Sequence, residues 1–107
     1  MNKRQYFRFS VDLEVRYRIL ESLGPYKTTC TEDMGEGGLK INLLDYIEPE
    51  TRLEITVQLP GETYPIMAIG RVVWIKKKMF SDFFTTGIQL VYIDEQDKNR
   101  FYKYAVF

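Results

Sequence analysis

The chain has 107 residues, which is about the size of one domain and too short for two. Apolar residues make up 45% and charged residues 28%, ordinary values for a globular protein that exclude long disorder and collagen-like repeats. Fifteen basic residues balance fifteen acidic ones, whereas a protein that holds a long nucleic acid is normally basic. We therefore expect a single domain, residues 1–107, whose partner is not a long nucleic acid.

The absence of histidine and the presence of one cysteine narrow the possible chemistry. Imidazole acid/base catalysis, Ser-His and Cys-His nucleophile pairs, and thiolate or imidazole metal sites all need residues that the chain lacks. The sequence shows no paired acid and base together with a nucleophile. We therefore predict a binding protein that is not an enzyme and holds no metal or cofactor. The unpaired Cys30, with no signal peptide and no apolar run near the ~20 residues of a membrane span, predicts a cytoplasmic location.

The first nine residues are predicted to form a flexible basic arm that carries Arg4 and Arg8. In an extended chain, a spacing of four places both side chains on one side, with their Cα atoms ~13 Å apart. Guanidinium groups bind phosphate and the O6/N7 edge of guanine in bidentate fashion, and they stack on flat bases. Two arginines at this spacing are nevertheless common on polar surfaces, so the pair alone indicates a ligand only weakly.

Alternation of apolar and polar residues, typical of strands with one buried face, recurs along the rest of the chain. Glycine, proline and short polar turns interrupt it at intervals of roughly ten residues. The predicted strands cover residues 11–19, 26–31, 39–43, 53–59, 64–75 and 83–93. A C-terminal helix over residues 94–107 follows, with Asp94 as its N-cap and Phe101 and Tyr104 at helical spacing.

Six short strands with turn-rich connections predict an all-β fold with a C-terminal helix, in the form of a six-stranded antiparallel β-barrel. Closing the sheet into a barrel also removes exposed strand edges. The alternation places aromatic residues inside the barrel. Trp74 could stack a base, but on a strand with Gly70 and Val72 it is more often part of the barrel core or rim. We also expect Cys30 to be a small core residue. Lys76–Lys78 could contact a membrane or phosphates, but three lysines near a hairpin more often keep a loop soluble.

A second candidate for ligand binding is the glycine cluster that follows Asp33. Gly35, Gly37 and Gly38 lie between two predicted strands, where glycine allows a close approach of backbone to a ligand. Asp33 could accept hydrogen bonds from the N1/N2 edge of guanine or orient an arginine. For Asp and Gly in a turn, however, a purely structural role is the usual one.

Together, the two features resemble the PilZ domain family of small bacterial β-barrels that bind the second messenger cyclic di-GMP. Residues 4–8 fit the family's Arg-x-x-x-Arg motif, placed directly before the first strand. Residues 33–38 fit its Asp/Asn-x-Ser-x-x-Gly motif at the first and last positions, with glycine in place of serine. Further matches occur at residues 37–39, 70–74 and 87–89, so that the resemblance covers nearly the whole chain.

The resemblance implies a cyclic di-GMP receptor or adaptor whose arm changes conformation on binding and which signals to a separate partner protein. Gly35 in place of serine implies one hydrogen bond fewer and therefore weaker binding. The implied ligand-binding residues are Arg4, Arg8, Asp33, Gly35, Gly37 and Gly38, with Arg71 as a weaker candidate on the barrel surface.

Two other functions remain open. A degenerate PilZ-like adaptor could have lost the nucleotide and act through protein contacts alone, although the retention of both arginines argues against it. A barrel with 16 aromatic residues could also bind single-stranded nucleic acid, as OB folds do, but the zero net charge and the inward aromatic pattern argue against that class.

Overall fold

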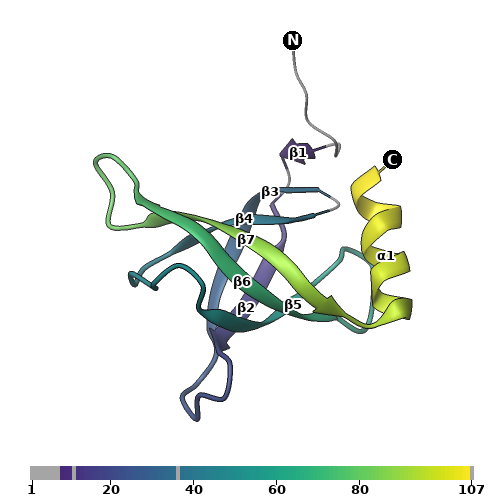
Figure 1. The fold of residues 1–107 in the computed structure, drawn as a ribbon. Coiled ribbons are helices and arrows are strands. Elements are labelled where there is room, and N and C mark those ends of the chain that lie inside the picture. Colours follow the sequence, from purple (N-terminus) through teal and green to yellow (C-terminus); the bar gives the residue numbers. More distant parts are fainter. Residues whose placement is uncertain (1–7, 11, 36, 107) are drawn as a thin grey trace.

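The fold is known from a computed structural model that describes residues 8–10, 12–35 and 37–106. Each strand of the barrel pairs with its neighbours in antiparallel fashion, and one helix follows the last strand (Figure 1). In chain order, the elements are β1 (Arg8–Ser10), β2 (Glu14–Ile19), β3 (Lys27–Gly35), β4 (Gly38–Leu43), β5 (Arg52–Val57), β6 (Ile66–Lys77), β7 (Phe84–Ile93) and α1 (Glu95–Val106).

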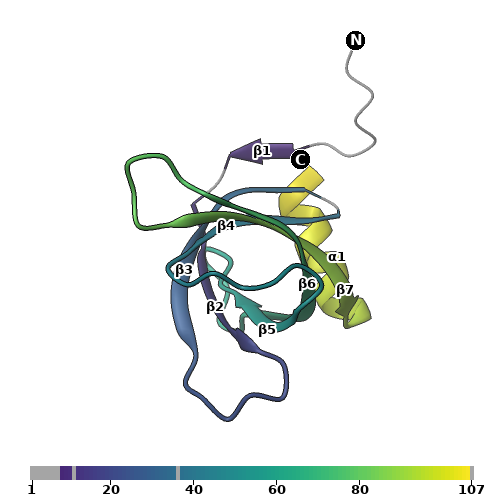
Figure 2. The same cartoon turned by 60° about the vertical axis from the view of Figure 1, so that its left-hand side comes forward.

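Strands β2 to β7 form a closed barrel. Their order around the barrel is β3-β2-β5-β6-β7-β4, and β4 pairs back with β3 to close it (Figure 2). The predicted six-stranded antiparallel barrel with a C-terminal helix is therefore confirmed. Closure is favoured by the alternation in strands such as β2, β4 and β5, because their apolar faces must be covered on the inside.

The additional strand β1 extends the sheet along one edge of β3. Residues 27–30 of β3 pair with β2, and residues 33–35 pair with β1 on the same edge. The pairs are Arg8 with Gly35, Phe9 with Met34, and Ser10 with Asp33. Residues 8 and 9, assigned to the basic arm from the sequence, thus have a strand backbone, while residues 1–7 of that arm lie outside the described residues.

The barrel interior is filled by branched aliphatic side chains, such as Val15, Ile41 and Ile55. Only Tyr17 and Phe101 are buried among the described aromatic residues, so the prediction of an inward aromatic pattern is wrong. The physical reason is the narrow interior of a six-stranded barrel, which aliphatic side chains already fill. The exposed aromatic residues are Tyr26, Tyr46, Tyr64, Trp74, Phe80, Phe83 and Tyr92.

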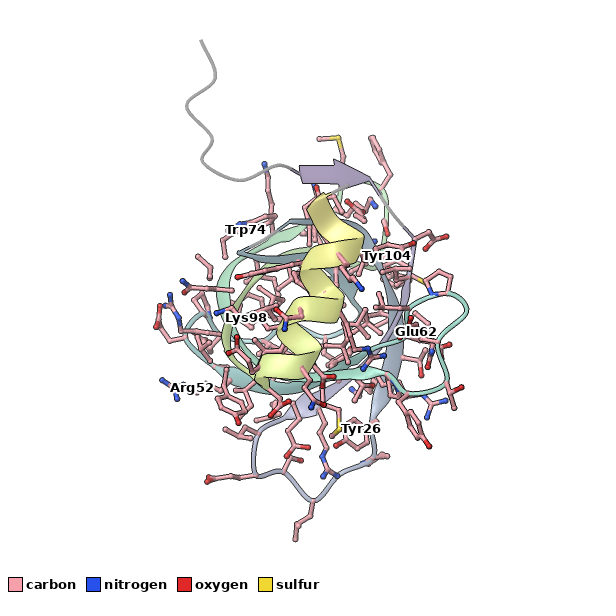
Figure 3. The ribbon with its side chains drawn as sticks, turned by 90° about the vertical axis from the view of Figure 1, so that its right-hand side faces the viewer. Tyr26, Arg52, Glu62, Trp74, Lys98 and Tyr104 are labelled. Carbon is pink, nitrogen blue, oxygen red and sulfur yellow. The ribbon has the colours of Figure 1, made fainter. Side chains whose placement is uncertain are left out.

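Helix α1 crosses in front of the barrel in the view of Figure 3 and contributes Phe101 to the core. Asp94 caps its first turn, since one of its carboxylate oxygens accepts a hydrogen bond from the backbone N–H of Gln96 at 3.2 Å. The helix also contacts β1, β3 and β6. No helix among the described residues has the length and hydropathy that a membrane crossing requires.

Cys30 is exposed, so the prediction that it belongs to the core is wrong. Its neighbour Thr31 faces inward instead, and the Thr31 hydroxyl accepts a hydrogen bond from the Leu13 N–H at 2.9 Å. The Thr-rich first half of β3 has no apolar alternation, and the sequence therefore did not determine which face is buried. Burial is the largest cause of a raised pKa of the Cys30 thiol, with hydrogen bonding to Asp12 next.

Candidate functional site

The β3–β4 hairpin brings the glycine cluster together in a tighter turn than the sequence predicted. Gly35 ends β3, Gly38 begins β4, and the two residues pair across the strands, so that only residues 36 and 37 connect them. A Cβ atom on Gly38 would lie 2.0 Å from the backbone oxygen of Ile88 on β7. Glycine at this position is therefore required by the close approach of β4 to β7.

A groove of about 480 Å³ runs over the outer surface of β4, β7 and β6 beside this hairpin. Its volume lies within the usual range for small-molecule sites. The lining residues are Asp33, Gly37, Gly38, Leu39, Lys40, Val73, Trp74, Gly87, Ile88 and Gln89.

Two β-bulges turn polar and aromatic side chains toward this groove. In β3 the register shifts between Thr31 and Asp33, so that Thr31 and Met34 face inward and Asp33 lines the groove. In β6 it shifts between Val72 and Trp74, so that Val72 is buried while Trp74 lines the groove. An inserted residue reverses the alternation of faces, and bulges often re-aim side chains at functional sites.

Of the two structural positions expected for Trp74, the barrel core and the rim, the structure excludes the core. Trp74 is 43% exposed, and Figure 3 shows it at the periphery of the molecule, toward the end where β1 lies. Its indole ring lies over Gly87, where a Cβ atom would be 2.2 Å from the Trp74 Nε1 atom. Gly87 pairs with Trp74 on one side and with Lys40 of β4 on the other. The missing side chain at Gly87 allows the indole to rest on the sheet.

Charged side chains form a chain of contacts at the β3 side of the groove. Lys40 Nζ lies 3.7 Å from an Asp33 carboxylate oxygen and 3.8 Å from one of Glu32. The other Glu32 oxygen accepts a hydrogen bond from Lys78 Nζ at 2.6 Å. Hydrogen bonding to Lys78, and then to Asn42, lowers the pKa of Glu32. The groove thus contains a cation, Lys40, held between two carboxylates.

The structure brings most of the predicted ligand-binding residues to one place. Asp33, Gly37 and Gly38 line the groove, and Gly35 lies at its edge, opposite Arg8 in the β1–β3 pairing. The backbone of Arg8 is described and its side chain is not, and Arg4 lies outside the described residues.

Arg71 lies on β6 and does not line the groove. Its Nη1 atom donates to both carboxylate oxygens of Glu50 at 2.8 Å, and its Nη2 atom donates to the side-chain oxygen of Gln89. Gln89 is a lining residue, so Arg71 reaches the groove only through this contact.

Sequence reasoning missed Lys40, Gly87 and Gln89 as lining residues. An isolated glycine within a strand indicates a close approach of other atoms, and Gly87 carried that signal. Lys40 and Gln89 are ordinary outward residues of alternating strands, and their approach depends on the pairing of β4 with β7, which no local pattern specifies.

The sequence and the fold were compared with those of known proteins. The family model described as "PilZ domain" matches residues 2–106. No curated protein matches the chain significantly in sequence.

Several solved structures share the fold at low sequence identity. The inhibitor of motility MotI/DgrA of Bacillus subtilis is 21% identical, with a TM-score of 0.79 over 97% of this chain and 50% of its own. The PilZ domain of YcgR from Escherichia coli with c-di-GMP is 13% identical, with a TM-score of 0.70 over 92% of this chain and 86% of its own. The K. pneumonia MrkH–c-di-GMP complex is 16% identical, with a TM-score of 0.74 over 97% of this chain and 50% of its own. The chain thus spans about half the length of MotI/DgrA and MrkH.

Proposed function

The chain belongs to the PilZ domain family, and from this premise we propose that it is a receptor for cyclic di-GMP that binds the nucleotide without chemical change. The solved structures of YcgR and MrkH with c-di-GMP support the choice of ligand. An exposed thiol at Cys30 persists in a reducing compartment, which supports a cytoplasmic site of action.

The observation that carries the proposal is the pairing of β1 with β3. It sets Arg8 of the first motif opposite Gly35 of the second, and it places Ser10 opposite Asp33. Directly opposed residues of antiparallel strands have Cα atoms about 5 Å apart. The last residue of the arginine motif thus lies beside the aspartate-glycine motif, more than twenty positions away in the sequence, and Asp33, Gly37 and Gly38 of the second motif line the groove.

The chemistry of the groove suits a dianionic ligand with flat bases. Lys40 and the two arginines of the arm supply positive charge for the phosphates, and Asp33 supplies acceptors for the N1/N2 edge of guanine. Trp74 presents an indole on which a base can stack. In this proposal, Arg4 and Arg8 bind the ligand on the side of the arm. The glycines at 35, 37 and 38 keep the barrel side of the groove open.

We further propose that binding is passed on through β1 to a separate effector protein. β1 has three residues and, among the residues that the structure describes, pairs with no strand other than β3. α1 contacts both β1 and β3, so that a movement of β1 would also displace α1. Ordering of the arm over the ligand would convert binding into a change of shape.

The proposal is tested by calorimetric titration of the full chain with cyclic di-GMP, with cyclic di-AMP as the matched control. We expect saturable binding of the guanine nucleotide and much weaker binding of the adenine one, because adenine lacks the O6 acceptor and presents a different edge to Asp33. A chain that binds neither nucleotide but still captures a partner would instead be the ligand-free adaptor. The same titration gives the number of nucleotide molecules bound.

Gly35→Ser is expected to tighten cyclic di-GMP binding by up to about tenfold. Serine restores the hydroxyl of the family motif, and one neutral hydrogen bond contributes ~0.5–1.5 kcal/mol. Calorimetry of both proteins checks this result. Gly35→Ala is the control because it adds a Cβ atom without the hydroxyl, and equal affinities of the serine and alanine variants would contradict the alignment of the motif.

Trp74→Ala is expected to weaken binding about tenfold, since stacking of a base on an aromatic ring contributes ~1–3 kcal/mol. The melting temperature should fall modestly, because Trp74 is 43% exposed and its indole ring also packs on the sheet over Gly87. Tyr64→Ala is a suitable control, as Tyr64 is also an exposed aromatic residue but does not line the groove. Unchanged affinity of Trp74→Ala would remove Trp74 from the proposed site.

A further inference from the structure

The hairpin of β6 and β7 projects from the barrel, at the end of these strands that is remote from α1 (Figures 1 and 2). Its loop is closed by a hydrogen bond of 2.8 Å from the Lys78 N–H to the Phe83 carbonyl oxygen. Residues 79–82 therefore form the tip. A second bond, from the Phe83 N–H to the Ser81 hydroxyl at 3.0 Å, shapes the turn.

Two large apolar side chains occupy this tip without cover. Phe80 is 100% exposed and Met79 is 78% exposed. Phe80 also has a φ of 58°, a left-handed conformation that is unfavourable for a bulky aromatic residue. Both the lost burial and the backbone conformation make phenylalanine a poor choice here for stability alone, which points to a role in contact with something else.

Positive charge surrounds the base of the tip. Lys76 and Lys77 are exposed and lie on opposite faces of the β6 ribbon. Within the described ranges neither lysine pairs with a carboxylate, whereas Lys78 is held by Glu32 and ties the hairpin to the barrel. Asp82 is the one acidic residue among the tip residues 79–82.

We propose that this tip docks on an anionic lipid bilayer, with Phe80 and Met79 inserted among the headgroups and Lys76 and Lys77 against the lipid phosphates. Apolar side chains at the tip with lysines at its base are typical of proteins that bind the membrane interface. In such proteins, insertion of apolar groups and attraction to anionic lipid act together. A protein partner fits less well, because a stable interface buries ~800 Å² per partner and a turn of four residues offers far less. The docking is independent of the nucleotide.

The experiment is co-sedimentation of the full chain with vesicles of phosphatidylcholine alone or of phosphatidylcholine with phosphatidylserine. We expect binding to the anionic vesicles only, with a loss at high salt because screening weakens the attraction of the lysines. Phe80→Asn should lower the partition coefficient about tenfold, since it removes an inserted ring and suits a positive φ. Lys76→Gln and Lys77→Gln should each lower it roughly fivefold.

Leu23→Asn is the matched control, because Leu23 is also 100% exposed but lies in the β2–β3 loop. Leu23→Asn should bind to the vesicles as the unsubstituted chain does, with an unchanged melting temperature. The melting temperature of Phe80→Asn should not fall, because asparagine suits the positive φ at this position. The proposal is overturned if the chain leaves anionic vesicles unbound, as it would if the tip served a protein partner. It is also overturned if Phe80→Asn binds normally or if Leu23→Asn loses as much binding.

Discussion

Arg8→Ala is expected to weaken cyclic di-GMP binding about hundredfold, which corresponds to about 3 kcal/mol. The register of β1 places the backbone of Arg8 opposite Gly35, at the edge of the groove, and the proposed site assigns the Arg8 guanidinium to the ligand bound there. Hydrogen bonds between charged groups contribute ~1.5–3 kcal/mol each, and guanidinium forms them in pairs. Calorimetry with the nucleotide measures the effect, and Arg4→Ala should act in the same direction.

Arg52→Ala provides the control for this loss. Arg52 is exposed on β5, which does not line the groove, so its removal lowers the net charge equally without touching the site. Arg71→Ala should have an intermediate effect because Arg71 reaches the groove only through Gln89. Equal affinities of Arg8→Ala and Arg52→Ala would mean that Arg8 acts only through overall charge, and the proposed site would then be wrong.

Gly38→Ala is expected to lower the free energy of unfolding by about 3 kcal/mol, the upper part of the usual range for overpacking. The new Cβ atom would lie 2.0 Å from the Ile88 oxygen, and backbone atoms cannot rotate away as a side chain can. β4 and β7 must separate, which opens the barrel between these two strands. A fall in melting temperature of roughly 10–20 °C follows for a domain of this size.

Gly24→Ala is the control for Gly38→Ala. A Cβ atom on Gly24 would lie 3.4 Å from the Ser22 hydroxyl, an ordinary contact, so the melting temperature should hardly change. A stable Gly38→Ala variant that has lost only its affinity for the nucleotide would show that Gly38 serves the ligand and not the packing of β4 on β7.

The barrel was predictable because its strands alternate regularly. Residues such as Leu53, Ile55 and Val57 are all buried as their spacing requires. β1 was not predicted, since three residues carry no period and their pairing with β3 is a tertiary contact. β6 was predicted to end at Ile75 but runs to Lys77, because charged residues continue a hairpin once it has left the core.

The candidate site was predictable only where it is local in sequence. The motif at residues 33–38 identified Asp33 and Gly38, both of which line the groove. Strict alternation groups Trp74 with the buried Val72, and the bulge between them places Trp74 in the groove instead. Bulges depend on how two strands fit together, so a single strand's pattern does not reveal them.

The short β1 covers backbone groups of β3 that would otherwise be unpaired. Without β1, the backbone of residues 33–35 has unpaired N–H and C=O groups on that edge, while β4 remains bound to the other. Such an edge is a template for an incoming strand from any chain, and proteins ordinarily keep such templates covered. β1 therefore covers this edge with three residues, and displacement of β1 would expose the edge to pairing with a strand of another chain.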